Sequence, residues 1–281
     1  MIPSLRYTLL RLRGQIIGWG LALAALSLLV VPLYDMAVQQ RAQIEGLIKS
    51  LPPELLMFVG SFDRMFSPAG FLDTRYFSML PLILGVFTVV IGSGLIVSDE
   101  ENGTLDLILA QPVSRVELYI GRWLAFSAAL IGILFIAWLG LIAGIRIGSI
   151  DLNGLAVARP FISLFCVLSW FGGLALMLSL IAPSRRQAAS LSGLVLVASY
   201  FVTTLAKIST DLSGLATVSP LTYYQGGAAI ETLNAGDALG LAMTALGFVV
   251  IGLWLFQRRD IRIAGEGGWR LPRLAPRHPR T

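Results

Sequence analysis

Residues 77–97 read FSMLPLILGVFTVVIGSGLIV, a run of 21 residues without a charged side chain. An α-helix rises about 1.5 Å per residue, so this run is long enough to cross the roughly 30 Å hydrocarbon core of a bilayer. Five further uncharged runs of similar length lie at residues 15–34, 123–145, 160–182, 188–206 and 238–256. The sequence therefore predicts an all-α membrane protein with six transmembrane helices.

The composition separates into apolar runs and ordinary solvated connections. The 281 residues are 56% hydrophobic and 13% charged, with a mean hydropathy of +0.79. None of the 21 Lys and Arg or 16 Asp and Glu residues lies inside the six runs. Six buried core helices would need a far larger soluble protein to cover them, so we interpret residues 1–281 as a single transmembrane domain that ends in a basic tail at 257–281.

The basic residues predict the orientation of the chain. If both termini are cytoplasmic, 14 Lys and Arg lie on the inner side and 7 on the outer side, which is the usual inner excess. We therefore expect a multi-pass protein of the cell membrane with both termini inside and a long outer loop at 35–76. Residues 3–13 place Leu5, Leu9 and Leu12 on one helical face among arginines, which predicts an interfacial N-terminal helix. The basic tail would face anionic headgroups, so no nucleic-acid partner is needed to explain it.

Several kinds of chemistry are excluded by residues that the chain lacks. With one cysteine, Cys166, and one histidine, His278, the chain contains no disulfide, no HExxH zinc site and no Ser-His-Asp triad of its own. Its lysines, Lys49 and Lys207, do not stand in a GxxxxGK[ST] phosphate-binding loop. The uncharged spans disfavour self-contained ion-driven transport, which generally needs ionisable groups inside the membrane. We therefore expect no catalytic residue, metal or cofactor in this chain, and any transport would take its energy from a partner.

The connection at 98–122, SDEENGTLDLILAQPVSRVELYIGR, is the most informative one. Thr104 is a candidate N-cap, and Leu105, Ile108 and Leu109 form an apolar stripe at helical spacing. Pro112 ends this short helix.

A second helix is predicted to start directly after that proline. Ser114 and Glu117 have the spacing of a capping box, and Val113 and Leu118 that of a hydrophobic staple. The two helices together form a stiff elbow on the inner face of the membrane.

Other segments carry weaker predictions. Residues 218–227, VSPLTYYQGG, are too short to span a membrane and too apolar for an ordinary loop, which predicts a re-entrant segment between the last two spans. Gly140 and Gly144 form a GxxxG pair suited to close helix contacts. A translocation path would be lined by the few polar side chains within spans, namely Thr88, Ser93, Thr203 and Thr204.

The run DEENGTLDLILAQPVSRVELYIGRW resembles the cytoplasmic loop after the second span in membrane subunits of type-2 ATP-binding-cassette (ABC) exporters. The six-span layout, the interfacial N-terminal helix, the Ser-Pro-Leu-Thr-Tyr stretch at 219–223 and the exit at 256–260 are also similar to that family. The positions that match the loop pattern are Asp99, Glu100, Gly103, Thr104, Leu105, Pro112, Ser114 and Arg115.

The resemblance implies a permease subunit that pairs with a second permease copy and sits on separate ATPase subunits, which bind ATP and Mg. It implies that residues 104–110 are a coupling helix that fits a groove in the ATPase. It also implies outward export, and the apolar spans favour a lipid-like, drug-like or other amphipathic substrate. The expected coupling residues are Asp99, Glu100, Glu101, Gly103, Thr104, Leu105, Ile108, Leu109, Pro112, Ser114, Arg115 and Glu117.

Two other functions fit the same residues. Asp99, Glu100 and Glu101 could bind a magnesium ion without histidine, which would make the chain an integral-membrane enzyme. A non-transporting membrane assembly protein is the other alternative.

Overall fold

The computed structural model describes residues 2–40, 66–110, 113–148, 150–206 and 213–258, and this part of the chain contains helices and turns but no strand. Six helical stretches within it are long and apolar enough to cross a membrane, which confirms the predicted fold class. They are Ser4–Gln40, Pro68–Gly94, Arg115–Ile147, Ala156–Ile181, Arg185–Ala206 and Ala235–Arg258.

The long helices that form these stretches are joined by short elements. The long ones are α1 (Ile2–Val30), α6 (Leu80–Gly94), α9 (Arg115–Ile147), α10 (Arg159–Ile181), α11 (Arg185–Ala206) and α13 (Ala235–Arg258). The short α-helices are α5 (Pro68–Leu72), α7 (Val97–Glu101), α8 (Leu105–Leu109) and α12 (Ser213–Ala216). The remaining turns are the π-helix η1 (Asp73–Phe77) and the 3-10 helices η2 (Ala156–Ala158), η4 (Pro220–Tyr223) and η5 (Gly226–Ile230).

The N-terminal segment is helical, as predicted, but it is not a separate helix. Residues 3–13 continue without a break into the first span as α1, and the chain is helical again over 33–40, beyond the predicted end at residue 34. The tail at 259–281 and most of the outer loop lie outside the described residues.

The second span begins earlier than its uncharged sequence predicted. The Ser67 side chain accepts a hydrogen bond from the Gly70 N–H at 3.1 Å, and Pro68 occupies the first helical position, so the helical run starts there instead of at residue 77. The run contains Asp73, whose Oδ1 accepts a hydrogen bond from the Gly227 N–H at 2.6 Å. Because this backbone partner satisfies the carboxylate, a charged residue is tolerated where the sequence indicated a loop.

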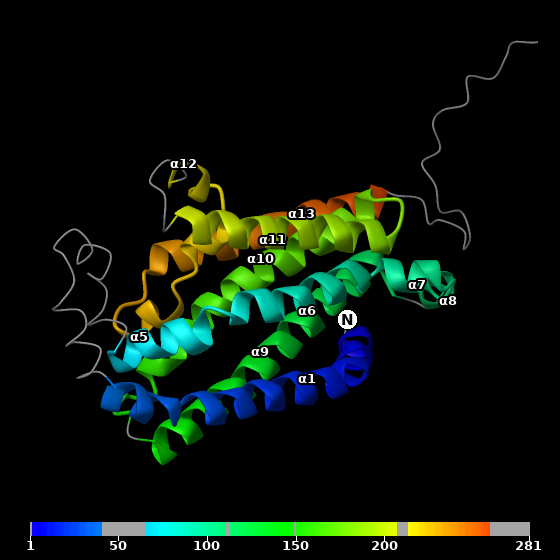
Figure 1. The fold of residues 1–281 in the computed structure, drawn as a ribbon. Coiled ribbons are helices and arrows are strands. Elements are labelled where there is room, and N and C mark those ends of the chain that lie inside the picture. Colours follow the sequence, from blue (N-terminus) through cyan, green and yellow to red (C-terminus); the bar gives the residue numbers. More distant parts are fainter. Residues whose placement is uncertain (1, 41–65, 111–112, 149, 207–212, 259–281) are drawn as a thin grey trace, which may run out of the picture.

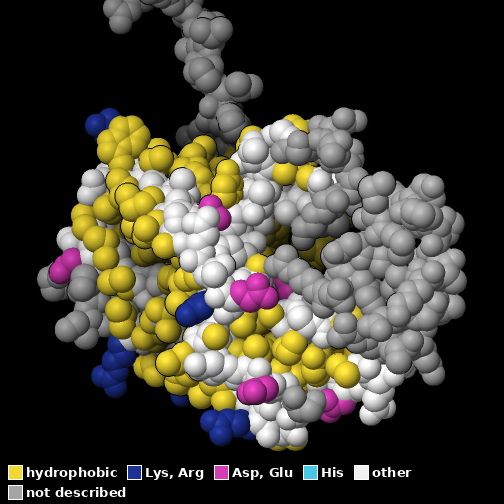
Figure 2. Space-filling model, turned by 90° about the vertical axis from the view of Figure 1, so that its left-hand side faces the viewer, with side chains coloured by type: hydrophobic (Ala, Val, Ile, Leu, Met, Phe, Trp, Pro, Cys, Tyr) yellow, Lys and Arg dark blue, Asp and Glu magenta, His cyan; other side chains and the backbone are white. Residues whose placement is uncertain are grey.

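The bundle has two distinct ends (Figure 1). The N-terminus of α1, the helices α7 and α8, the α10–α11 turn and the end of α13 lie at one end, here called the α7 end. The opposite end, here called the α5 end, carries α5 and the segment before α13. On the face seen from the α5 end, acidic and basic side chains are scattered singly among uncharged and hydrophobic ones (Figure 2).

Small residues set the closest helix contacts. A methyl group at Gly140 would overlap Ala24 of α1, and one at Gly92 would lie 2.6 Å from the Gly172 carbonyl oxygen of α10. Gly144 also faces α1, near Val31. The predicted GxxxG pair therefore packs α9 against α1 within this chain.

Two hydrophobic clusters hold the helices together. The larger one extends through α1, α6, α9 and α10. The smaller one lies at the α7 end and includes Leu105 of α8, Leu118 and Tyr119 of α9, and Phe256 of α13. At about 1.5 Å per residue the 33-residue α9 is about 50 Å long, so it extends beyond a roughly 30 Å hydrocarbon core.

Candidate functional site

The connection between the second and third spans contains α7, α8 and the start of α9, and α8 and α9 correspond to the two helices of the predicted elbow. Helix α7 is followed by Gly103, whose φ of +67° lies in the left-handed region that favours glycine. The Gly103 N–H donates to the Glu100 carbonyl at 3.1 Å, and the Thr104 N–H donates to the Asp99 carbonyl at 2.9 Å. This is the Schellman pattern of a helix C-terminus, and it fixes the angle at which α8 leaves α7.

Thr104 precedes α8 at the position expected of an N-cap. Its hydroxyl donates to the Asp99 carbonyl at 3.2 Å, so the side chain points back to α7. Its own carbonyl accepts from the Ile108 N–H at 3.1 Å and begins the next turn. One residue therefore joins both short helices.

The start of α9 has the predicted capping box. The Ser114 hydroxyl accepts from the Glu117 N–H at 3.2 Å, and the Glu117 carboxylate accepts from the Ser114 N–H at 3.3 Å. Val113 and Leu118 both pack on the hydrophobic cluster of the α7 end, as the staple predicted. Pro112 lies outside the described residues.

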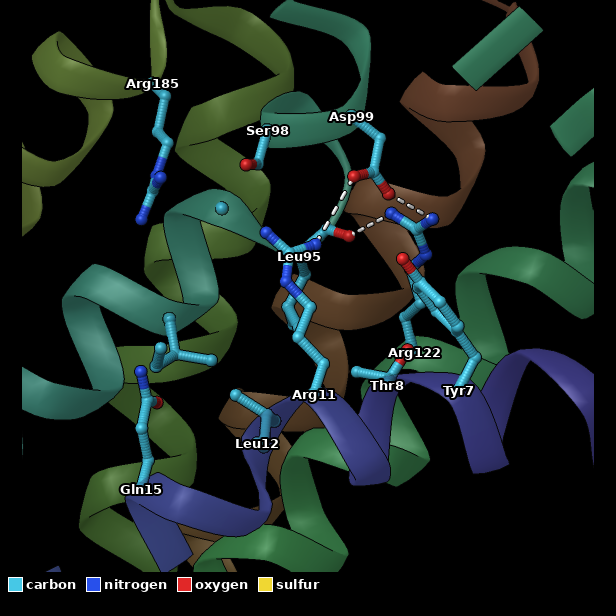
Figure 3. A pocket seen from close by; sticks show the side chains of 12 residues that line it. Tyr7, Thr8, Arg11, Leu12, Gln15, Leu95, Ser98, Asp99, Arg122 and Arg185 are labelled. Carbon is cyan, nitrogen blue, oxygen red and sulfur yellow. Dashed lines mark hydrogen bonds and ion pairs between the residues drawn. The ribbon is translucent and has the colours of Figure 1, made fainter. Parts of the chain in front are cut away.

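A buried ion pair joins α7 to α9, and sequence reasoning missed it. The Arg122 guanidinium contacts the Asp99 carboxylate and also donates to the Leu95 carbonyl. Arg122 is only 4% exposed and Asp99 only 6%. Arg11 of α1 approaches the same carboxylate at 3.4 Å (Figure 3). Asp99, expected as a contact for a partner, is thus enclosed by this chain's own arginines. The sequence feature that could have indicated this pair is the position of Arg122, directly before the uncharged run at 123–145.

The three neighbouring acids point in different directions. Glu100 is buried in α7, whereas Glu101 is exposed and accepts a hydrogen bond from the Arg185 N–H of α11 at 2.8 Å. In the described part of the chain, His, Cys, Asp and Glu side chains form no group of three or more that could hold a metal ion. Asp99 and Glu101, on which the metal-enzyme alternative partly rests, therefore have different partners: Asp99 is paired with Arg122, and Glu101 is bonded to the Arg185 backbone.

The apolar stripe of α8 packs inward. Leu105 is 2% exposed within the hydrophobic cluster of the α7 end, and Ile108 and Leu109 are partly buried against it. Leu107 points outward and is 70% exposed, and residues 101–104 are exposed beside it. Leu107 and residues 101–104 are therefore exposed, whereas Leu105 of the stripe is covered by this chain and Ile108 and Leu109 are partly covered.

The first turns of α9 are also fixed to α13. The Tyr119 hydroxyl donates to the Val249 carbonyl at 2.9 Å, and Tyr119 stacks on Phe256. Arg115 donates to the Phe256 carbonyl at 3.3 Å. The start of α9 is therefore in direct contact with α13.

The expected path residues are not brought together. The hydroxyls of Thr88 and Ser93 donate to carbonyls of their own helix, those of Gly85 and Val90. Thr203 instead bonds to Ser219, at 2.8 Å, and to Thr222. Thr204 is exposed on α11.

The segment between α11 and α13 is folded against the α5 end as two 3-10 turns, η4 and η5. The Tyr224 hydroxyl donates to the Phe77 carbonyl at 3.1 Å, and the Gln225 N–H donates to the Ser163 hydroxyl at 3.1 Å. Gly226 adopts a φ of +50° next to Asp73. The segment is thus packed between the second and fourth spans.

Comparison with known proteins agrees with the six-span architecture. A search of curated proteins found no match for this chain. The family model described as ABC-2 family transporter protein matches residues 17–261, which include all six spans apart from the first residues of the first one. This multi-pass membrane chain therefore belongs to the ABC-2 family of transporter proteins, as a permease subunit of an ABC transporter.

Proposed function

We propose that this permease exports its substrate with energy from a separate ATPase subunit, which binds the elbow around α8. In this proposal the α7 end and both termini are cytoplasmic, the protein lies in the cell membrane, and a second permease copy completes the transporter. The ATPase binds ATP and Mg, and this chain carries out no chemical step itself.

The exposed Leu107 is the observation that carries the proposal. It protrudes at 70% exposure from a short helix whose opposite face is buried. An isolated large apolar side chain at the tip of a stiff, capped elbow is suited to insert into a groove of a partner. Residues 101–104 would surround it with polar contacts.

The stiffness of the elbow supports a role in transmitting force. A ligand or partner shifts a conformational equilibrium only through differential contacts, and a flexible loop would absorb the closure of an ATPase. Here the capping box, the Gly103 turn and the Asp99–Arg122 pair hold α7, α8 and α9 to one another.

An apolar groove supports a lipid-like, drug-like or other amphipathic substrate. It lies between α10, α13 and η4, has a volume of about 670 Å³, and is lined by Trp170, Tyr223 and Phe248 with Asp237 among its polar groups. Ligand pockets commonly occupy about 300–1,000 Å³ and combine an apolar wall with a few polar groups.

The test is binding of the full chain to an ABC ATPase subunit that co-purifies with the parent chain, with Leu107→Asp as the variant and Leu155→Asp as the matched control. Leu155 is 76% exposed in the connection between α9 and α10, at the opposite end of the bundle from α8. Loss of a central contact worth about 2 kcal/mol would weaken binding about 30-fold. We expect this loss, together with loss of coupled transport, for Leu107→Asp only.

The purified variant should unfold at the same temperature as the parent chain. Unchanged affinity and transport in Leu107→Asp would overturn the proposed docking surface. Leu105→Asp is not a suitable test, because burying a carboxylate in the cluster of the α7 end would disturb the fold itself.

A further inference from the structure

A basic cavity lies at the α7 end between α1, α6, α7 and α11. Its volume is about 240 Å³, whereas one water needs roughly 10–15 Å³ by the same kind of measure. Its polar lining comes from Thr8, Arg11, Gln15, Ser98, Asp99, Arg122 and Arg185.

The lining has an excess of positive charge. Three guanidinium groups face one carboxylate, and Arg122 and Asp99 already form the buried pair. The excess therefore comes from Arg11 and Arg185. The Arg11 side chain is 53% exposed, and its guanidinium lies 3.4 Å from Asp99. Because more than half of this side chain is uncovered, the guanidinium can also bind a further anion.

Arg185 extends toward the cavity from the side opposite to Arg11 (Figure 3). Its Nη2 donates to the Val90 carbonyl at 3.1 Å, and its guanidinium lies over Gly94, where a side chain would collide with it. Glu101 accepts from the backbone N–H of Arg185 and is not part of the cavity lining. The Arg185 guanidinium is thus held beside Gly94 in the lining of the cavity, which also includes Gln15 and Ser98.

We propose that this cavity binds the phosphate of an anionic phospholipid headgroup between Arg11 and Arg185. Guanidinium groups bind phosphate oxygens through paired, charge-assisted hydrogen bonds. The cavity is lined by the N-terminal part of α1, the last turn of α6 and the first residue of α11. Candidate spans begin or end there, and headgroups lie at the ends of spans in a bilayer. This inference does not depend on the ATPase, the substrate or the direction of transport.

The surface beside Arg185 favours a lipid over a soluble phosphate compound. Val90, whose carbonyl holds Arg185, presents an exposed side chain on α6, and Val86 is exposed one turn away on the same face. An acyl chain attached to the bound phosphate can lie along these valines, whereas inorganic phosphate gains nothing from them.

The experiment titrates the delipidated full chain, in detergent, with phosphatidylglycerol, phosphatidylcholine and inorganic phosphate, and measures the dissociation constants. We expect phosphatidylglycerol to bind at least about tenfold more tightly than phosphatidylcholine. Arg11→Gln and Arg185→Gln should each weaken phosphatidylglycerol binding about tenfold, as expected for loss of a charge-assisted hydrogen bond.

Arg13→Gln and Arg186→Gln are the matched controls, because both arginines are exposed neighbours outside the cavity lining. They should retain the parent affinity, and Arg11→Lys and Arg185→Lys should retain part of it. Equal losses in the control variants, or no loss in Arg11→Gln and Arg185→Gln, would overturn the proposal. Tight binding of inorganic phosphate without a preference for phosphatidylglycerol would overturn the assignment to a lipid.

Discussion

The guanidinium of Arg122, in the second turn of α9, is paired with the carboxylate of Asp99 in α7, and both residues are buried. The pair joins α9, which continues into the third span, to the short helix α7. Because Leu95 and Arg11 also contact these two side chains, one polar cluster connects α1, α7 and α9 and the end of the second span.

Neutralising Asp99 should therefore be strongly destabilising. Asp99→Asn leaves Arg122 as an uncompensated buried charge, and removal of one partner of such a pair costs about 3–5 kcal/mol. The free energy of unfolding of the full chain in mixed micelles measures this cost. The double variant Asp99→Leu, Arg122→Met should recover most of the loss, since it removes both charges. A single variant as stable as the parent would show that the pair contributes nothing.

Replacement of Gly103 should loosen the elbow by a smaller amount. In Gly103→Ala a side chain must adopt φ +67°, which costs about 1–2 kcal/mol. Faster hydrogen exchange at residues 97–109 would report the change locally. Gly14→Ala is the control, because Gly14 lies in α1 with open space around it, and alanine there should be neutral or stabilising. Equal exchange in both variants would contradict a requirement for glycine at the turn.

Leu105 and Leu107 should differ sharply in their effect on stability. Leu105→Ala removes a side chain that is 2% exposed, and such core truncations cost about 2–5 kcal/mol. Leu107→Ala removes one that is 70% exposed, and surface changes usually stay within about 0.5 kcal/mol. Thermal unfolding of the two purified variants tests the assignment of the inner and outer faces of α8. A larger loss of stability in Leu107→Ala than in Leu105→Ala would mean that α8 is rotated about its axis.

Enlarging Gly140 should separate α1 from α9. The side chain of Gly140→Leu would overlap Ala24, so the helices must move apart and lose packing along their contact. We expect a loss of more than 1 kcal/mol and enhanced accessibility of a cysteine placed at residue 24. Gly247→Leu, at a site of α13 with nothing within contact distance, is the control. No difference between the two variants would argue against this helix contact.

The hydrogen bond between Asp73 and Gly227, at the α5 end, should contribute to the stability of the protein. Asp73→Asn keeps an oxygen that can accept the Gly227 N–H, whereas Asp73→Ala leaves that N–H without its partner. A lost bond to a charged acceptor costs roughly 1.5–3 kcal/mol, so the alanine variant should be the less stable one. Unfolding of both variants in mixed micelles measures the difference. Equal stability would exclude a structural role for this bond.

The sequence by itself determined the six spans and the elbow. Bilayer thickness imposes a minimum length on each apolar run, and the capping box and the apolar periodicity of α8 are local signals that need no distant partner. For the same reason the bounds of α10 and α13 agree with the predicted spans to within three residues at each end.

Only the tertiary structure decided which faces are covered. The charge of Asp99 indicated an exposed contact, but Arg122 and Arg11 come from distant positions in the chain and enclose it. The apolar stripe of α8 likewise became an inner face because the smaller hydrophobic cluster lies beneath it, which leaves Leu107 outside. Burial and charge pairing depend on partners far apart in sequence, and local periodicity carries no information about where those partners lie.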